Sequence, residues 1–202
     1  MASAYPEPNR GVDDRPLRAR RGDLAAFDEL VVEYEAQVYN LCYRILGSSA
    51  SAEDAAQEAF VSAWRNIETF RGESFKPWLM RIAANQCRDE LRRRGRRPST
   101  SLDSALEAGM PDPPAADPSP EATALNTELG RTLQAALDEL PEEQRTAVVL
   151  CDVEGLDYSE IALAVNTSLG TVKSRISRAR LKLRELMQRE PELLPGRIRP
   201  GQ

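Results

Sequence analysis

The stretch from Tyr158 to Arg184, YSEIALAVNTSLGTVKSRISRARLKLR, decides the fold class. It is typical of a short helix, a tight turn and a longer basic helix. Apolar residues of the second helix recur at helical spacing, which predicts one stripe packed on a domain core: Val172, Ile176, Ala179, Leu183 and Leu186. Asn166 and Gly170 fall where the first helix should stop and the chain should reverse. The pattern predicts a helix-turn-helix.

Basic side chains fill the other side of this predicted second helix. They are Lys173, Arg175, Arg178, Arg180, Lys182 and Arg184. A helix divided in this way can lie in a DNA groove, where its N-terminal side chains reach base edges and its basic side chains reach phosphates. The alternative is a solvated basic helix that closes an all-helical domain. The turn between the two helices favours the DNA-binding interpretation.

The composition of the chain argues against several other classes of protein. It has 202 residues, 41% hydrophobic and 29% charged, as expected for one soluble domain or two small ones. The N-terminus has no apolar run that could form a signal peptide or a membrane span, so we expect a cytoplasmic protein without membrane insertion. Three dispersed cysteines and no histidine predict no metal site. No nucleophile elbow or phosphate-binding glycine loop is present, so we expect neither enzyme activity nor a cofactor.

Charge is strongly segregated along the chain. The formal net charge is -5, yet the sequence contains one arginine cluster before residue 98 and the basic helix near its end. The cluster consists of Arg92, Arg93, Arg94, Arg96 and Arg97. No basic residue falls between Arg97 and Arg131, where acidic residues are frequent. Segregation of this kind predicts separate surfaces for separate partners, only some of them DNA.

Helical periodicity and proline content divide the chain into two helical domains. Residues 98–126 contain six prolines and no sustained apolar period, which predicts a flexible, acidic, proline-rich linker. We therefore expect an all-α fold with small helical domains over residues 20–97 and 127–190. Residues 1–19 are expected to form a disordered extension and residues 191–202 a flexible tail. The linker would allow the domains to bind well-separated sites on one larger target.

One predicted helix of the first domain carries an acidic and amide face. The residues Ser51-Ala-Glu-Asp54 are similar to a capping box, so this helix is expected to begin there. Asp54, Gln57 and Glu58 fall at i, i+3 and i+4 and share one side of the helix. A patch of this kind on its own is also typical of solvated surface, or of charges favoured at a helix start.

Three motifs, in this order along the chain, resemble the signatures of one family. They are AEDAAQEAFVSAW at 52–64, FRGESFKPWLMRIAAN at 70–85 and GTVKSRISRAR at 170–180. The chain resembles an extracytoplasmic-function sigma factor, a subunit of bacterial RNA polymerase with only the second and fourth sigma domains. The resemblance covers residues 20–97 and 125–188, and it implies a region 2 bundle followed by a region 4 helix-turn-helix.

The resemblance implies roles for residues of the first domain. Asp54, Gln57 and Glu58 match the contacts to the clamp helices of the largest polymerase subunit, a role that suits an acidic and amide face. The loop 70–75 matches the pocket for a base flipped from the non-template strand of the minus-ten element, where an unpaired base needs aromatic stacking. The implied minus-ten contacts are Phe70, Arg71, Ser74, Phe75, Arg81, Asn85 and Arg88. For Arg81, a plain polar helix surface is an equal alternative.

The resemblance also implies a minus-thirty-five reader and a set of partners. The candidate DNA contacts are Thr171, Lys173, Ser174, Arg175, Ser177 and Arg178, and a good bidentate base contact contributes about 1–3 kcal/mol of discrimination. The implied partners are promoter DNA, core RNA polymerase, including the flap of its second-largest subunit, and an anti-sigma factor. The linker corresponds to a segment that runs into the polymerase cleft, with a mere spacer as the alternative. Asn166-Thr-Ser-Leu169 departs from the apolar-proline pair that is usual in the family.

These observations predict an alternative sigma factor that directs core RNA polymerase to specific promoters and helps to melt them, in a stress or envelope response. The competing hypothesis is a free-standing helix-turn-helix regulator, which would bind duplex DNA without polymerase and normally dimerise on repeated half-sites. The acidic face around Asp54 and the single copy of the helix-turn-helix favour the sigma factor.

Overall fold

The computed structural model describes residues 13–72, 74–96 and 120–188. Its elements are α1 (Arg15–Arg20), α2 (Leu24–Leu46), α3 (Ser49–Arg65), the 3-10 helix η1 (Ile67–Thr69), α4 (Phe75–Arg96), α5 (Pro120–Asp138), α6 (Glu142–Val148), the π-helix η2 (Val149–Val153), α7 (Tyr158–Ala164) and α8 (Leu169–Met187). All regular secondary structure within the described residues is helical, which confirms the predicted all-α fold class.

The first domain is built on the long helix α2, and local sequence sets both of its ends. The Asp23 carboxylate accepts a hydrogen bond from the backbone N–H of Ala26 at 3.1 Å, which caps the helix start. At the other end Gly47 adopts a left-handed φ of 69°, a conformation that costs glycine little, and its N–H donates to the Tyr43 carbonyl at 2.8 Å. The chain therefore reverses at Gly47 and packs α3 against α2.

Helices α3 and α4 of the first domain begin at positions that relate differently to their local sequence. Helix α3 begins at Ser49, before the capping box expected at Ser51, and the Ser48 side chain makes no cap hydrogen bond. The expected capping box was therefore wrong. Helix α4 begins at Phe75, so that Pro77 lies in its first turn, where a missing N–H costs nothing.

Two predicted domain boundaries also require correction. Most of helix α1, which ends at Arg20, lies in the segment 1–19 that was expected to be a disordered extension, and its Pro16 and Ala19 are buried. Helix α5 begins at Pro120, inside the expected linker 98–126, because a proline at the first helical position does not interrupt helical hydrogen bonding. The remaining linker residues, 98–119, and the expected tail, 191–202, lie outside the described residues.

The helix-turn-helix of the second domain is formed by α7 and α8. A capping box starts α7: the Asp157 carboxylate accepts from the N–H groups of Ser159 and Glu160, and the Glu160 side chain accepts from the Asp157 N–H. Asn166 has a φ of 51° and forms the predicted reversal. Gly170, expected in the turn, lies within α8 because the Ser168 hydroxyl caps that helix by accepting from the Thr171 N–H at 3.1 Å.

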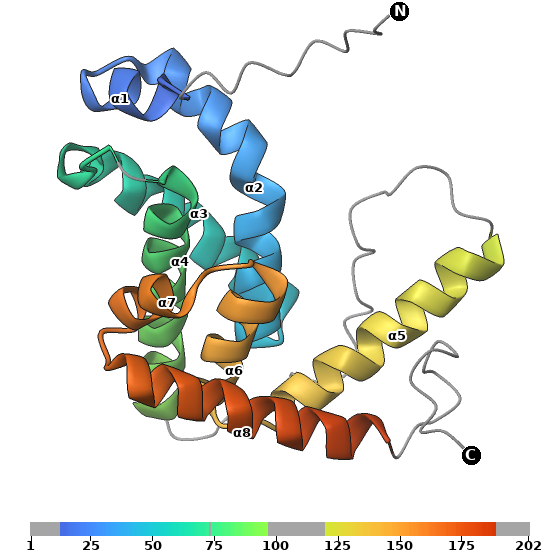
Figure 1. Cartoon of the computed structure of the whole chain (residues 1–202). Coiled ribbons are helices and arrows are strands. Elements are labelled where there is room, and N and C mark those ends of the chain that lie inside the picture. The colour runs from blue at the N-terminus through green and yellow to red at the C-terminus, as the bar shows by residue number, and fades with distance from the viewer. Residues whose placement is uncertain (1–12, 73, 97–119, 189–202) are drawn as a thin grey trace, which may run out of the picture.

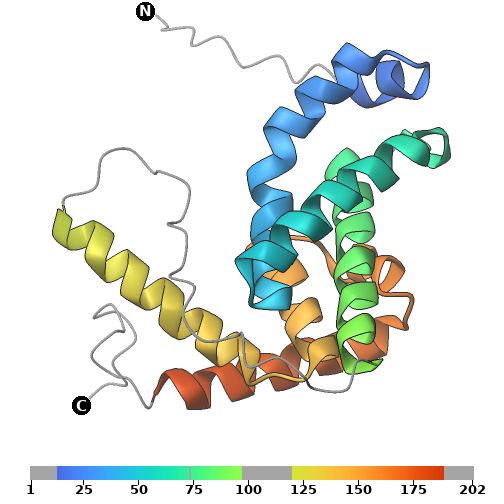
Figure 2. The same ribbon diagram turned by 180° about the vertical axis from the view of Figure 1, so that it is seen from behind.

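The two domains pack against each other. Figure 1 shows α7 beside α4, α6 in front of α2, and α8 running below both, and Figure 2 shows α2, α3 and α4 from the opposite side. Buried apolar residues of both domains belong to one continuous cluster, which includes Leu41 and Leu79 from the first domain and Leu150 and Ile176 from the second. The two sequence units therefore share a hydrophobic core.

Candidate partner and nucleic-acid interfaces

The acidic and amide face lies on the outer side of α3. Asp54, Gln57 and Glu58 are all exposed, whereas the other side of the helix buries alanines: Ala52, Ala55, Ala56, Ala59 and Ala63. Glu58 makes one long contact, 3.8 Å from its Oε1 to Arg65 Nη1, between two largely exposed side chains. Such a pair contributes little to stability, so this acidic face is available to a partner.

The aromatic residues of the loop before α4 are buried. Phe70 is 2% exposed and Phe75 is 6% exposed. Their ring centroids lie 5.7 Å apart, and those of Phe70 and Trp78 lie 5.6 Å apart in an edge-to-face arrangement. Tyr34 from α2 also packs on Phe75, at 5.6 Å. Neither phenylalanine therefore presents an open ring face to a base in this structure, contrary to the sequence-based expectation.

The polar residues of the same loop and of α4 have different environments. Arg71 and Ser74 are exposed at the loop, Asn85 is exposed on α4, and Arg81 and Arg88 are half-buried. Arg88 Nη1 donates to Asn85 Oδ1 at 3.3 Å. These α4 side chains can contact a polar ligand without disturbing the core.

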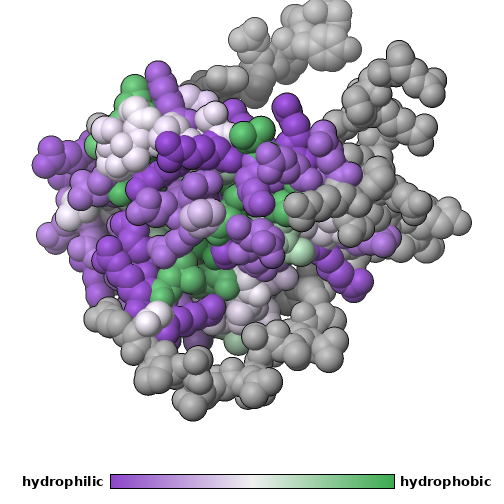
Figure 3. Space-filling view, turned by 90° about the horizontal axis from the view of Figure 1, so that it is seen from below, coloured by the Kyte–Doolittle hydropathy of each residue, from purple (hydrophilic) through white to green (hydrophobic). Residues whose placement is uncertain are grey.

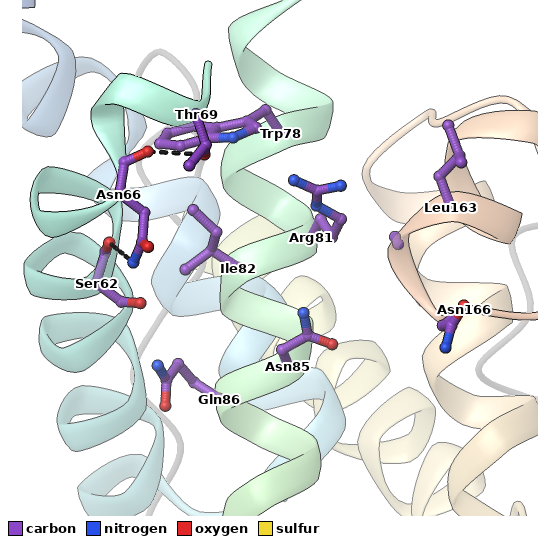
Figure 4. Close-up of a pocket in the computed structure, with 11 residues that line it drawn as sticks. Ser62, Asn66, Thr69, Trp78, Arg81, Ile82, Asn85, Gln86, Leu163 and Asn166 are labelled. Atoms are coloured by element: carbon purple, nitrogen blue, oxygen red, sulfur yellow. Dashed lines mark hydrogen bonds between the residues drawn. The ribbon is translucent and has the colours of Figure 1, made fainter. Parts of the chain in front are cut away.

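A crevice of about 410 Å³ separates α4 from the second domain (Figure 4). Its lining is mostly polar and comes from α3, η1, α4, α7 and the turns that follow α3 and α7: Ser62, Asn66, Thr69, Trp78, Arg81, Ile82, Asn85, Gln86, Leu163, Ala164 and Asn166. The indole N–H of Trp78 is buried and has no hydrogen-bond partner. Sequence reasoning missed Ser62, Asn66 and Thr69, because their proximity to α4 depends on how α3 packs.

The predicted recognition helix has the expected division between core and surface. Of the predicted stripe, Val172, Ile176 and Ala179 are buried, whereas Leu183 and Leu186 are only half-buried. Lys173, Ser177 and Arg178 are exposed, and Thr171 and Ser174 are half-buried. Ser174 Oγ donates to the Thr171 carbonyl at 2.9 Å, within the first turns of α8. Figure 3 shows the molecule from below, where hydrophilic side chains cover most of the visible surface between smaller apolar patches.

Two arginines of α8 are held by carboxylates of neighbouring helices. Arg175 pairs with Glu143 of α6, and the Arg175 side chain is only 19% exposed. Arg180 Nε donates to Asp152 Oδ2 at 2.9 Å, and this hydrogen bond lowers the pKa of the Asp152 carboxyl. The sequence pattern did not indicate these pairs, because each joins residues far apart in the chain. If Arg175 or Arg180 contacts DNA, its ion pair with Glu143 or Asp152 must first break.

Comparison with known proteins identifies the family. Residues 30–97 match the model for sigma-70 region 2, and residues 130–183 match the model for sigma-70 region 4. The chain is 45% identical over 169 residues to the ECF RNA polymerase sigma factor SigE of Mycolicibacterium smegmatis, covering 82% of this chain and 64% of that protein. It is 41% identical to the RNA polymerase sigma-H factor of Pseudomonas aeruginosa, over 85% of this chain and 91% of that protein.

A solved structure supports the same assignment. The sigma factor RpoE of Bartonella quintana, in complex with the anti-sigma factor NepR, superposes with a TM-score of 0.61 at 27% identity. The match covers 80% of this chain and 96% of that one. The fold and the two matched regions define a sigma-70-type transcription factor. Within that class, the chain belongs to the extracytoplasmic-function sigma factors.

Membrane insertion was not expected from the sequence. In the parts of the chain that the structure describes, no helix is both long and apolar enough to cross a membrane.

Proposed function

We propose that this chain is an alternative sigma factor, which binds core RNA polymerase, directs it to specific promoters and helps to melt them. The observation that carries the proposal is the combination of two surfaces in one chain. An exposed acidic face on α3 and an outward basic face on α8 lie in the two regions that match sigma-70 regions 2 and 4.

The acidic face is the proposed contact with the polymerase. Asp54, Gln57 and Glu58 can accept or exchange hydrogen bonds with the basic clamp helices of the largest subunit, and charge complementarity would steer the encounter. The exposure of all three side chains supports this role, because no part of the fold must move to present them.

The promoter contacts are divided between the domains. Lys173, Ser177 and Arg178 are exposed on α8 and suit duplex contacts to the minus-thirty-five element. Arg71, Ser74, Arg81, Asn85 and Arg88 suit the unpaired strand of the minus-ten element, with amide and guanidinium groups for phosphates and base edges. Phe70 and Phe75 are better explained as the packed base of this loop, which holds Arg71 and Ser74 in place.

A regulatory partner also belongs to the proposal. The structural relative RpoE is bound to an anti-sigma factor, and we propose that an anti-sigma factor controls this chain in a stress or envelope response. The second domain would also contact the flap of the second-largest polymerase subunit.

The decisive experiment is transcription in vitro from a library of genomic fragments, with core polymerase in the presence and absence of the protein. We expect transcripts that depend on the protein and share two upstream sequence elements. The competing function, a free-standing regulator, predicts instead tight sequence-specific binding to duplex DNA by the protein alone and no new transcripts with core polymerase.

A further inference from the structure

A large apolar side chain lies exposed at the start of α8, the second helix of the helix-turn-helix. Leu169 is the first residue of this helix, and it is 45% exposed. It belongs to the segment 166–169, which departs from the apolar-proline pair that is usual in the family. The Ser168 hydroxyl accepts from the Thr171 N–H at 3.1 Å and caps α8. This cap therefore places Leu169 in the first turn of the helix.

Leu169 lines an open hollow at the starts of the two helices of the motif. The hollow has a volume of about 500 Å³, and its lining is Leu156, Asp157, Tyr158, Ser159, Leu169 and Lys173. Leu156 belongs to the apolar core and Tyr158 packs against it, so the core holds these two side chains in place. Lys173 and then Ser177 follow Leu169 at intervals of four residues and are also exposed on the same side of α8. The hollow is therefore continuous with the proposed minus-thirty-five contact face.

The charge of the hollow favours a base edge over a phosphate. The Asp157 carboxylate lines it and accepts from the N–H groups of Ser159 and Glu160 at 2.7 Å and 2.8 Å. The hydrogen bond from the Glu160 N–H lowers the pKa of the Asp157 carboxyl, so this group is ionised at neutral pH. A phosphate in the hollow would meet this negative charge beside the apolar Leu169 side chain, whereas an uncharged base edge would not be repelled.

The chemistry of the major groove restricts what Leu169 can recognise there. The N-terminal residues of a recognition helix reach base edges in this groove. Most groups on those edges donate or accept hydrogen bonds, and the one apolar substituent is the C5-methyl group of thymine. A leucine side chain offers no hydrogen bond, and covering a donor or acceptor without a partner costs free energy. Leu169 therefore favours thymine at the base pair that it covers.

We propose that Leu169 is a specificity-determining residue, which packs on the C5-methyl group of a thymine in the minus-thirty-five element. The inference rests on the proposed function and adds an apolar contact to the polar contacts of α8. Lys173 and Ser177, further along the same side of the helix, contact the phosphates or base edges that follow.

The test removes the methyl group alone. Deoxyuridine pairs as thymidine does and lacks only the C5-methyl group, so each thymine of the upstream promoter element is replaced in turn, on either strand. Core polymerase assembled with the full chain is titrated with these promoter fragments. We expect one replacement to weaken binding about fourfold, the effect of losing one buried methyl group. An element without thymine, or binding that no replacement weakens, would overturn the inference.

Variants of Leu169 show whether this residue covers the methyl group. Leu169→Ala should weaken binding to thymine DNA by a similar factor and should no longer respond to deoxyuridine, because both changes remove the same contact. Alanine favours helix, so α8 should still form, and circular dichroism checks this. Leu169→Met keeps an apolar side chain of similar volume and should retain the response.

The matched control is Leu181→Ala, since Leu181 is 59% exposed and lies further along α8. This variant should respond to deoxyuridine as wild type does. If Leu169→Ala also responds as wild type does, another residue covers the methyl group and the proposal is wrong.

Failure of the proposed function gives a different pattern. In that case core polymerase with the wild-type chain forms no promoter-specific complex on either thymine or deoxyuridine DNA, and the inference is overturned with the proposed function. Failure of the inference alone leaves specific complexes that do not respond to the methyl group, or that respond equally in Leu169→Ala.

Discussion

Two polar faces of the first domain differ in whether the second domain lies beside them. The acidic face of α3 around Asp54 is exposed, whereas the polar face of α4 around Arg81 lines a crevice whose opposite wall is formed by α7. The first face is acidic and the second carries arginine and amide groups, so their charges suit different partners, but the sequence does not show which face lies beside the second domain. The difference teaches that the surroundings of a polar surface in this protein depend on where the second domain lies as well as on which side chains are present.

The largest expected effect concerns the α4 side of the first domain, where Phe75 begins α4 and packs in an aromatic cluster with Phe70 and Trp78. We expect Phe75→Ala to lower the free energy of unfolding by about 3–5 kcal/mol, because it removes a buried ring and leaves a cavity. Urea denaturation measures this loss. The neighbouring exposed residue provides the control, since Arg71→Ala should change stability by only about 0.5 kcal/mol. An unchanged unfolding midpoint for Phe75→Ala would show that the ring is solvent-facing and free to stack on a base.

Substitutions on the acidic face of α3 should weaken binding and leave the stability of the fold unchanged. We expect Asp54→Ala combined with Glu58→Ala to weaken association with core polymerase about tenfold or more, since several charge-assisted hydrogen bonds are removed. Competition against a labelled sigma factor measures the affinity. Glu53→Ala, on the same helix and also exposed, is the matched control. Equal competition by the double variant and wild type would mean that the acidic face is only solvated surface.

The basic face of α8 extends the comparison to the second domain. If Lys173 and Arg178 contact phosphates, each alanine substitution should reduce the slope of log affinity against log salt concentration by about one. Promoter binding by the assembled polymerase is measured between low and moderate salt. Arg184→Ala, near the far end of α8, should leave the slope unchanged. If Lys173→Ala keeps the wild-type slope, Lys173 does not contact a phosphate.

The smallest expected effect is a pH dependence at the interface. Burial raises the pKa of the Glu154 carboxyl, although Lys76 opposes the shift. A raised folded pKa means that this group stabilises the fold fully below its unfolded pKa, and that this stabilisation is lost as the pH rises through the folded pKa. We therefore expect the stability of wild type relative to Glu154→Gln to fall between acidic and neutral pH. Urea denaturation at several pH values measures this difference, with exposed Glu139→Gln as the control. A difference independent of pH would exclude a raised pKa at Glu154.

Local sequence predicted features that depend on one helix at a time. The buried stripe of α8, with Val172 and Ile176, follows from helical periodicity, and the shared side of Asp54 and Glu58 follows from their spacing. The reversal at Asn166 was also confirmed, whereas Gly170 was misplaced because the Ser168 cap allows α8 to begin before it. A glycine in a first helical turn and one in a turn look alike in the sequence.

Features that combine distant parts of the chain were not predictable in the same way. The crevice joins α3, η1 and α4 to α7, and the pair between Lys76 and Glu154 joins two separate sequence motifs. The burial of Phe70 and Phe75 also depends on Tyr34 of α2 and Trp78 of α4. An aromatic residue in a polar loop is compatible with both a stacking platform and a core anchor, and only the tertiary packing separates these roles.

The continuous apolar cluster across the two domains has a consequence for how the protein unfolds. Leu41 and Leu79 of the first domain pack in the same cluster as Leu150 and Ile176 of the second, so unfolding of one domain would expose apolar surface of the other. We therefore expect both sequence units to unfold together in one cooperative transition rather than in two separate steps.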